Sequence, residues 1–389
     1  MNTVNLWDLA REYPASRMGL NPFSWYREMR VQSPVHFNKR WHVWEVFTHE
    51  FCQEILRRPD IFSSQRGAIE KVERERIGSI LGLDPPRHHQ LRALVSQAFT
   101  PRSIARLEGR IRQVVDMLLD RRPHTNQLDL IHDLAYPLPV IVLTEMLGVP
   151  LEELDTFKRY SDDMISDSKE RASAGSEELD HYCRGIIQTR RQEPRDDLIS
   201  DLLAARVDDK PLTEDEIVDF CILLLLAGNE TTTNLIGNAM LCFDEQPEIW
   251  AELRANQGLL PGALEEVLRF RSPVQRMSRL CLSDTQIAGQ HIRAGQGIFL
   301  WLGSANRDEQ QFPHAETFDI YRSPNKHLAF GNGIHMCLAS SIPRLEARIA
   351  YECLLTRFSI LERDRSVPLQ SILSVLGHGV KHLLLKIAE

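Results

Sequence analysis

One cysteine, Cys337, ends a glycine-rich run that leads directly into a helical pattern, and this arrangement constrains the fold more than any other feature. The run is Phe330-Gly331-Asn332-Gly333-Ile334-His335-Met336-Cys337. Glycine has no Cβ, so the backbone can turn tightly here and approach a flat group closely. A thiol binds a metal as the thiolate, and backbone N–H groups and a helix N-terminus lower the pKa of a thiol. The run indicates a metal-binding thiolate or, as composition alone would favour, a buried structural cysteine beside a glycine turn.

A helix is predicted directly after this run. Pro343 suits its first turn, because proline is tolerated where the N–H has no helical partner. The helix is predicted to end near Phe358, and its apolar positions are Leu345, Ala347, Ile349, Ala350, Cys353 and Leu354.

Composition excludes several classes of protein. The chain of 389 residues is long enough to bury a large core, and its net charge of -8 gives no reason to expect nucleic acid or an acidic membrane surface as a partner. Its seven cysteines are scattered without a C-x-x-C pair, which is typical of a reducing cytoplasm rather than of a zinc ribbon or a disulfide framework. The N-terminus has no signal-peptide core, and the apolar run 222–227 is far shorter than the roughly 18 residues that suggest a membrane span. We expect a soluble, cytoplasmic protein without a membrane partner.

Strands are predicted to be short and few. Residues 35–37 and 42–47 are typical of an early hairpin, and residues 380–387 of an edge strand near the C-terminus. Helical patterns dominate from about Pro85 onward.

Two amphipathic helices are predicted in the middle of the chain, over 151–166 and 177–191. The polar stretch 167–176 separates them. This stretch would be either a mobile lid or an ordinary solvated connection.

A long helix is predicted to begin at Thr213, which forms a capping box with Glu216, and to run to about Phe243. At 1.5 Å per residue it would span roughly 45 Å, enough to cross a domain of this size. Its first half is apolar on every side, so we expect that half to be buried.

Polar residues interrupt this helical pattern at 228–234, Gly-Asn-Glu-Thr-Thr-Thr-Asn. One interpretation is that Gly228 ends one helix and that Asn229 or Thr231 caps the next, which propensity alone would favour. The alternative is a single kinked helix in which Thr231 bonds back toward the carbonyl of Ala227 and makes room for a small ligand such as dioxygen. Glu230 would then supply protons from the solvent side.

Two charged pairs have ordinary explanations when each is taken alone. Glu266 and Arg269 are spaced i, i+3 on a helix, where an exposed ion pair contributes only about 0.2–1 kcal/mol. His88 and Arg92 share one face of another predicted helix, an arrangement that suits an anionic ligand but is more commonly a solvated charged face.

In their order along the chain, these segments resemble the cytochrome P450 superfamily of heme-thiolate monooxygenases, particularly its soluble bacterial members. The resemblance covers nearly the whole chain. The matching motifs are Phe330-x-x-Gly333-x-His335-x-Cys337, Ala227-Gly228-x-Glu230-Thr231-Thr232, Glu266-x-x-Arg269, Asp84-Pro85-Pro86-x-His88-x-x-x-Arg92, Ala305-Asn306-Arg307-Asp308 and Phe318-Asp319-x-x-Arg322.

The resemblance implies a mainly α fold with small β-sheets, in which residues 1–389 form a single domain around one heme b. Cys337 would be the axial ligand of the heme iron. Thr231 would position water and Glu230 would supply protons for oxygen activation. The heme propionates would be bound by His88, Arg92, Arg279 and His335. A buried structural network would consist of Glu266, Arg269 and Arg322.

The implied activity is monooxygenation, in which one atom of O2 enters a C–H bond of a hydrophobic small molecule such as a fatty acid, terpenoid, steroid or macrolide-like compound. We expect the substrate pocket to be lined by Leu223, Leu226, Ala227, Val274, Val375 and Leu376. Electrons would come from a separate ferredoxin or flavodoxin with its reductase. A positive docking patch on the cysteine side, or an ordinary solvated surface, would be formed by Arg102, Arg106, Arg110, Arg112, Arg344 and Arg348.

Two departures from the family pattern stand out. Ala339 replaces a glycine that many relatives carry two residues after the cysteine, which bears on heme seating, and the segment 169–184, which normally roofs the pocket, is short. Two other functions fit the same fold: a peroxide-driven hydroxylase, and a heme-thiolate sensor without turnover. The acid-alcohol pair Glu230 and Thr231 argues against both, because neither needs to deliver protons to activate O2.

Overall fold

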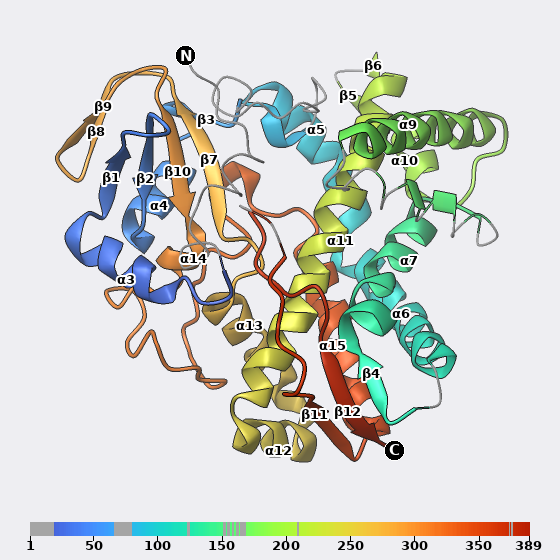
Figure 1. The fold of residues 1–389 in the computed structure, drawn as a ribbon. Coiled ribbons are helices and arrows are strands. Elements are labelled where there is room, and N and C mark those ends of the chain that lie inside the picture. Colours follow the sequence, from blue (N-terminus) through green and yellow to red (C-terminus); the bar gives the residue numbers. More distant parts are fainter. Residues whose placement is uncertain are drawn as a thin grey trace.

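The computed structural model describes residues 19–65, 80–122, 125–150, 153, 156, 157, 159, 160, 163, 169–207, 210–372, 374 and 376–389. Within these residues the fold is mainly α with small β-sheets, as predicted (Figure 1). The longer helices are α3 (Phe23–Gln32), α4 (His49–Leu56), α5 (Arg87–Val95), α6 (Pro101–Arg121), α7 (Pro137–Met146), α9 (Lys169–Gln192), α10 (Leu198–Ala204), α11 (Glu214–Asp244), α12 (Pro247–Ala255), α13 (Leu260–Phe270) and α15 (Ser341–Arg357). Shorter helical turns are η2 (Ile80–Gly82), η3 (Ser96–Phe99), η4 (Leu130–Ala135), η6 (Gln257–Leu259), α14 (Leu302–Ala305) and η7 (Gly333–His335).

A five-stranded sheet forms one side of the molecule, on the left of Figure 1. Its order is β1 (Val35–Asn38), β2 (Val43–Val46), β10 (Gly297–Trp301), β7 (Arg276–Cys281) and β3 (Phe62–Ser63). The antiparallel pairing of β1 with β2 confirms the predicted hairpin. Every residue of β10 is buried, so this central strand is covered on both faces. The remaining two-stranded pieces are β5 (Arg206–Val207) with β6 (Lys210–Pro211), and β8 (Thr285–Ile287) with β9 (Gln290–Ile292).

The C-terminal strand β12 (Leu384–Ala388) is not an edge strand, so that prediction was wrong. It pairs on one side with β11 (Ile360–Arg363) and on the other with β4 (Gln127–Asp129). The alternation of apolar and polar residues in β12 shows which face is buried, but it cannot show whether a distant segment such as β4 covers the second edge.

The long helix α11 is continuous from Glu214 to Asp244, and Thr213 and Glu216 form the predicted capping box. The polar stretch 228–234 therefore lies inside one helix and does not separate two. A membrane span would be permitted by the length and composition of α11, yet 67% of its most apolar window is buried inside the protein. Figure 1 shows α11 crossing the middle of the molecule, so it is a core helix.

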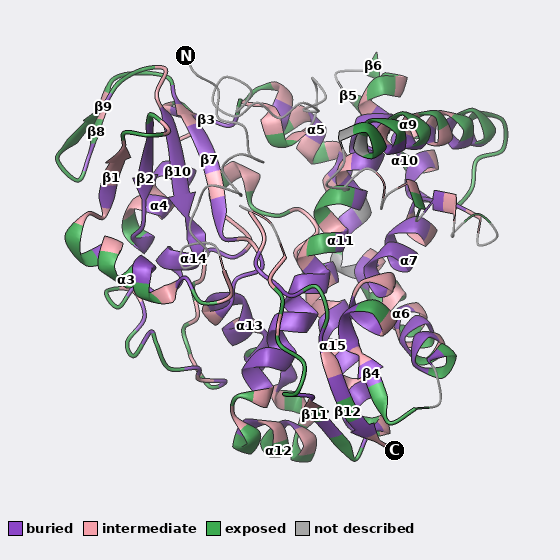
Figure 2. Cartoon of the chain, viewed as in Figure 1, coloured by how far each residue is buried: buried purple, intermediate pink, exposed green. Residues whose placement is uncertain are grey.

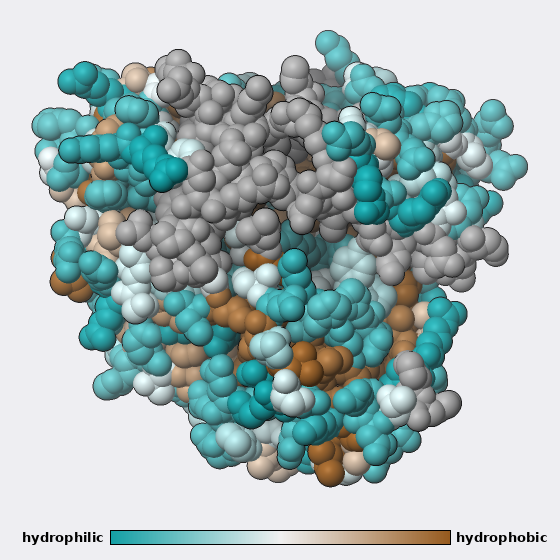
Figure 3. Space-filling model, viewed as in Figure 1, coloured by the Kyte–Doolittle hydropathy of each residue, from teal (hydrophilic) through white to brown (hydrophobic). Residues whose placement is uncertain are grey.

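Two hydrophobic clusters meet along α11. Its first half packs with α7, α9 and α10, and its second half with η4, α13 and α15. In Figure 2 the lower half of α11 is coloured almost entirely as buried. On the face seen in Figure 3 the surface is largely hydrophilic, with hydrophobic residues gathered in the lower middle of the view.

The polar stretch 167–176 does not form a separate connection, because from Lys169 onward it belongs to α9. Lysine, glutamate, arginine and alanine are good helix formers, and α9 has an exposed outer face that accepts polar residues (Figure 2). The predicted helix 151–166 lies largely outside the described residues.

Candidate functional site

The loop before Cys337 turns as its glycines require. Gly331 and Gly333 have φ angles of 73° and 72°, in the left-handed region that glycine tolerates. A Cβ on Gly333 would overlap the carbonyl oxygen of Leu56 at the end of α4. The close approach that requires this glycine is therefore to a neighbouring helix. The backbone N–H of Cys337 donates to the carbonyl of Phe330 at 2.9 Å, which closes the loop at the start of the turn into α15.

The side chain of Cys337 lines a cavity, and its exposed surface faces that cavity. The surrounding protein raises the pKa of its thiol, although the N–H of Ala339 and the charges of Arg92 and Arg344 act in the opposite direction. The protein alone therefore does not lower this pKa, contrary to the sequence-based expectation. A metal cation bound to the sulfur deprotonates a thiol outright, so this donor fits a bound iron.

His88 places a buried imidazole ring in the wall of this cavity. The side chain is fully buried on α5, and within the described residues neither ring nitrogen has a hydrogen bond. Burial and the neighbouring Arg92 lower the pKa of His88 to about 4. Buried polar groups are nearly always paired in native proteins, so a hydrogen-bonding group of a ligand is expected here.

His335 and Arg92 lie beside this ring. The rings of His88 and His335 are 4.1 Å apart between centroids, and Nη2 of Arg92 donates to the carbonyl of Met336 at 2.6 Å. All three side chains line the same cavity as Cys337, which gives a bound anion or propionate three nitrogen-bearing partners. Arg279, on β7, is buried and donates to the carbonyl of Ser278 at 2.7 Å, but it is not among the cavity-lining residues.

The cavity lies between the Cys337 loop and α11, and the space inside it amounts to about 1350 Å³, part of it open to solvent. Most of its wall is hydrocarbon, which suits a flat macrocycle and an apolar substrate. The apolar lining includes Leu143, Phe220, Leu223, Leu224, Ala227, Leu235, Leu268, Val274, Met277 and Ala329.

Of the six predicted pocket residues, Leu223, Ala227 and Val274 line this cavity, whereas Leu226 and Leu376 do not. Leu226 is 41% exposed. It stands one residue before Ala227, so the helical turn of about 100° points it away from the cavity face. Leu376 packs instead against the aromatic cluster of Trp25, Tyr26, Phe47 and Trp301. Val375 lies outside the described residues.

Thr231 lies on the cavity wall, and its hydroxyl donates to the carbonyl of Ala227 at 2.7 Å. Glu230 does not line the cavity; its carboxyl reaches toward Gly377 of the C-terminal segment, where a Cβ would meet Oε1. The protein atoms around Glu230 partly desolvate its carboxyl and raise its pKa, so this carboxyl exchanges protons closer to neutral pH than a fully solvated one. The hydroxyl of Thr231 thus lies on the cavity side of α11, and the carboxyl of Glu230 lies away from the cavity.

Glu266 and Arg269 form a buried pair that is 0% exposed on both sides, not a surface ion pair. Arg269 donates to both carboxylate oxygens of Glu266 at 2.9 and 2.7 Å, and Arg322 donates to the same carboxylate at 3.1 Å. The remaining N–H groups of Arg269 donate to the carbonyls of Asn306, Ala315 and Thr317. This network fastens α13 to the chain that leads into the Cys337 loop.

Glu346 is a site residue that the sequence analysis missed. It lies on α15, is 1% exposed and lines the cavity, and neither carboxyl oxygen has a hydrogen bond within the described residues. Burial raises its pKa to about 8, while the neighbouring hydroxyl of Thr232 acts in the opposite direction. The sequence signal that could have identified Glu346 is its position as a carboxylate on an otherwise apolar helix face, just before Ala347.

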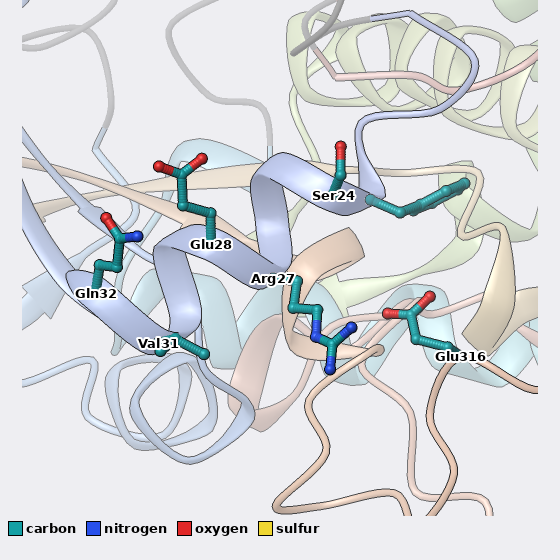
Figure 4. A pocket seen from close by; sticks show the side chains of 7 residues that line it. Ser24, Arg27, Glu28, Val31, Gln32 and Glu316 are labelled. Atoms are coloured by element: carbon teal, nitrogen blue, oxygen red, sulfur yellow. The ribbon is translucent and has the colours of Figure 1, made fainter.

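A second hollow, on the outside of α3, has no comparable chemistry. It encloses about 900 Å³ with open solvent included and is lined by Phe23, Ser24, Arg27, Glu28, Val31, Gln32 and Glu316. Figure 4 shows Arg27 reaching from α3 toward Glu316 on a neighbouring loop. These side chains offer neither thiol nor imidazole, so the cavity at Cys337 is the candidate site.

Comparison with known proteins shows which proteins this chain resembles. The family model for cytochrome P450 matches residues 142–385. The putative cytochrome P450 YjiB of Bacillus subtilis is 40% identical over 378 residues, covering 94% of each chain, and the cyclomarin C epoxidase CymV of Salinispora arenicola is 38% identical over 351 residues, covering 87% of this chain and 89% of its own. A crystal structure of CYP109E1 from Bacillus megaterium in complex with corticosterone has a TM-score of 0.89 at 40% identity and covers 94% of this chain and 98% of its own.

Proposed function

This chain belongs to the cytochrome P450 family and is a P450 monooxygenase, and we propose that it inserts one oxygen atom of O2 into a C–H bond of a hydrophobic small molecule. The observation that carries the proposal is the placement of Cys337 and Thr231 on the walls of one largely apolar cavity. A metal-binding thiolate and a hydroxyl that can position water thus face the same space, which is what oxygen activation beside an apolar substrate requires.

Heme b is the proposed cofactor, and when bound to Cys337 it supplies the iron at which O2 is activated. His88, Arg92 and His335 would hold its propionates, because these groups lie together and His88 has no hydrogen bond to any residue that the structure describes. Arg279 would need to reach the cavity from β7, so we propose it as a peripheral contact.

Thr231 would hold a water molecule at the cavity wall, and Glu230 would pass protons from the outer side toward it. The raised pKa of Glu230 suits this role, since a carboxyl that titrates closer to neutral pH both accepts and releases protons readily. Consecutive residues on a helix do not face each other, so this transfer would run through water between the two side chains.

The substrate is proposed to be an apolar molecule of steroid-like or macrolide-like size, with fatty acids and terpenoids as the other classes considered. The lining of Leu223, Leu224 and Val274 offers hydrocarbon contact and few hydrogen-bonding groups, so burial of apolar area would supply most of the affinity. The relative CYP109E1 was crystallised with corticosterone and with testosterone, which supports a rigid, flat substrate for this chain as well.

Electrons are proposed to come from a separate ferredoxin or flavodoxin with its reductase, in the cytoplasm. Four arginines of the predicted patch are paired with carboxylates, which reduces the positive charge available for docking. The pairs are Arg110 with Glu145, Arg112 with Glu352, Arg344 with Glu265 and Arg348 with Glu108. Docking would therefore depend on shape and on exposed charges such as that of Arg106.

The assignment is tested by the spectrum of the reduced protein with carbon monoxide. We expect the Soret band typical of thiolate ligation, and its loss in Cys337→Ser. The matched control is Cys353→Ser on α15, which should keep the band. If the wild-type protein shows no such band, or if Cys337→Ser retains it, the proposed heme-thiolate site is wrong.

A further inference from the structure

A second group of potential metal ligands lies away from the heme cavity, at one end of the small C-terminal sheet. Asp129 ends β4, His132 lies in η4 directly after it, and His382 precedes β12. One ligand atom of each residue lies within 4.8 Å of those of the other two. Asp129 and His382 are 253 residues apart in sequence, and the fold brings them together with His132.

The carboxylate of Asp129 is fixed in place by the backbone around it. Oδ1 accepts from the N–H groups of Ile131 and Leu383, each at 3.1 Å, and Oδ2 lies 2.8 Å from Nδ1 of His382. Asp133 accepts the N–H of Asp129 at 2.8 Å and brings a second carboxylate close to the cluster. The cluster thus holds a preoriented anion with further negative charge behind it.

The two imidazole rings lie at the surface, where they have room to rotate. His132 and His382 are exposed, and their rings are 4.5 Å apart between centroids with planes 32° apart. Donor atoms around a tetrahedral zinc ion lie about 2.0–2.2 Å from the metal, so small side-chain rotations would bring both rings into range. Such rotations cost little at an exposed position.

We propose that Asp129, His132 and His382 bind one divalent transition-metal ion, with zinc as the expected ion and water in the remaining position. Two imidazole nitrogens and a carboxylate oxygen form a donor set typical of zinc and its neighbours, and unsuited to calcium or magnesium, which prefer oxygen ligands alone. If His382 binds through Nε2, Asp129 instead orients its ring through Nδ1–H, as carboxylates commonly do for metal-bound histidines.

The bound ion would restrain the C-terminal segment that borders the heme cavity. In that segment Gly377 pairs with Val274 of the cavity wall and lies against the carboxyl of Glu230. His382 follows a few residues later, so an ion shared with η4 would fasten the end of this segment to the helical half of the protein. An ion that binds only to the folded protein would also stabilise the protein against unfolding.

The test is calorimetric titration of Zn²⁺ into the untagged, heme-loaded protein, in which the heme iron occupies Cys337. We expect one ion per chain. His132→Ala and His382→Ala should each weaken binding at least about tenfold, and Asp129→Asn about 10–100-fold whether this residue is a ligand or orients one. Zn²⁺ should also raise the unfolding temperature of the wild-type protein and not that of His382→Ala.

The matched control is His291→Ala, an exposed histidine on β9 in a different sheet, which should bind Zn²⁺ like the wild type. An unchanged Soret band in every variant shows that the heme site is intact. The proposal is overturned if the wild type does not bind one ion, or if His132→Ala and His382→Ala bind as tightly as His291→Ala. The latter result would mean an adventitious ion only.

Discussion

The hydroxyl of Thr231 donates a hydrogen bond to the carbonyl oxygen of Ala227, one turn earlier on α11, at 2.7 Å. Both residues line the cavity that also contains Cys337. This contact holds the Thr231 side chain in one rotamer on the cavity wall, and the helix remains continuous around it.

Thr231→Ala should therefore uncouple electron consumption from product formation. Removal of the hydroxyl removes the group that positions water, so O2 would be reduced without insertion into the substrate. The ratio of product formed to electron donor consumed should fall several-fold, while substrate binding remains nearly unchanged. Thr231→Ser is the control, because it keeps a hydroxyl, and it should retain most of the coupling. Equal coupling in Thr231→Ala and wild type would contradict the assigned role.

Leu223→Trp should weaken substrate binding by about tenfold or more, which corresponds to roughly 1.4 kcal/mol. Leu223 lines the cavity, so a larger side chain there takes up the space of the substrate. Leu226→Trp is the matched control, since Leu226 is exposed and points away from the cavity. The measurement is the spectral shift on titration with a steroid. A similar loss of affinity in both variants would show that the substrate does not occupy this cavity.

Glu346→Gln should stabilise the protein at high pH. The pKa of Glu346 is raised from 4.5 to about 8, so the folded state keeps its proton where the unfolded chain has lost it. The contribution of Glu346 to stability is therefore present below about pH 4.5 and falls as the pH rises toward 8. By pH 8 the cost is on the order of a few kcal/mol, which glutamine does not incur. Unfolding measured at pH 5 and pH 8 checks this: the advantage of the variant should grow between these values, and a constant difference would contradict it.

Glu266→Gln should cost about 3–5 kcal/mol of folding free energy, because two guanidinium groups, those of Arg269 and Arg322, lose their buried carboxylate. The control is Glu54→Gln, which breaks an ion pair with Arg58 whose side chains are 38% and 37% exposed. That change should cost no more than about 1 kcal/mol. Denaturant unfolding of the two variants compares them directly, and similar losses would contradict a structural role for the buried network.

Gly333→Ala should reduce the fraction of chains that retain heme. The left-handed backbone costs a residue with a Cβ roughly 1–2 kcal/mol, and here the Cβ would also overlap the carbonyl of Leu56. Gly289 also has a positive φ, 76°, but a Cβ there would meet open space. Gly289→Ala therefore tests backbone strain without steric overlap. The heme content per chain, read from the Soret absorbance, should fall for Gly333→Ala only. Equal heme content in the two variants would show that the overlap is relieved elsewhere.

Local features were predicted well because they depend on neighbours in sequence. The capping box at Thr213, the bond from Thr231 to Ala227 and the turn at Gly331 and Gly333 each follow from the chemistry of a few adjacent residues. The helix after Cys337 was also predicted to within a residue of its end, since its apolar spacing is regular.

Other features depend on contacts between distant segments, and for these the sequence was insufficient. Leu226 and Leu376 are as apolar as Leu223, yet only Leu223 faces the cavity, because the rotation of α11 and the packing of the C-terminal segment decide it. The same holds for Glu346, whose burial depends on what covers α15.

The sequence by itself determined the family of this protein and predicted its thiolate ligand and the helix that faces it, since each prediction depends on a short run of residues with little freedom of conformation. Only the tertiary structure decided which side chains share a space. It left His88 buried without a hydrogen bond to any of the described residues, paired most of the arginines of the expected patch with carboxylates, and brought His382 to Asp129 across nearly two thirds of the chain. Burial and charge pairing arise from packing between segments far apart in sequence, and no local pattern contains them.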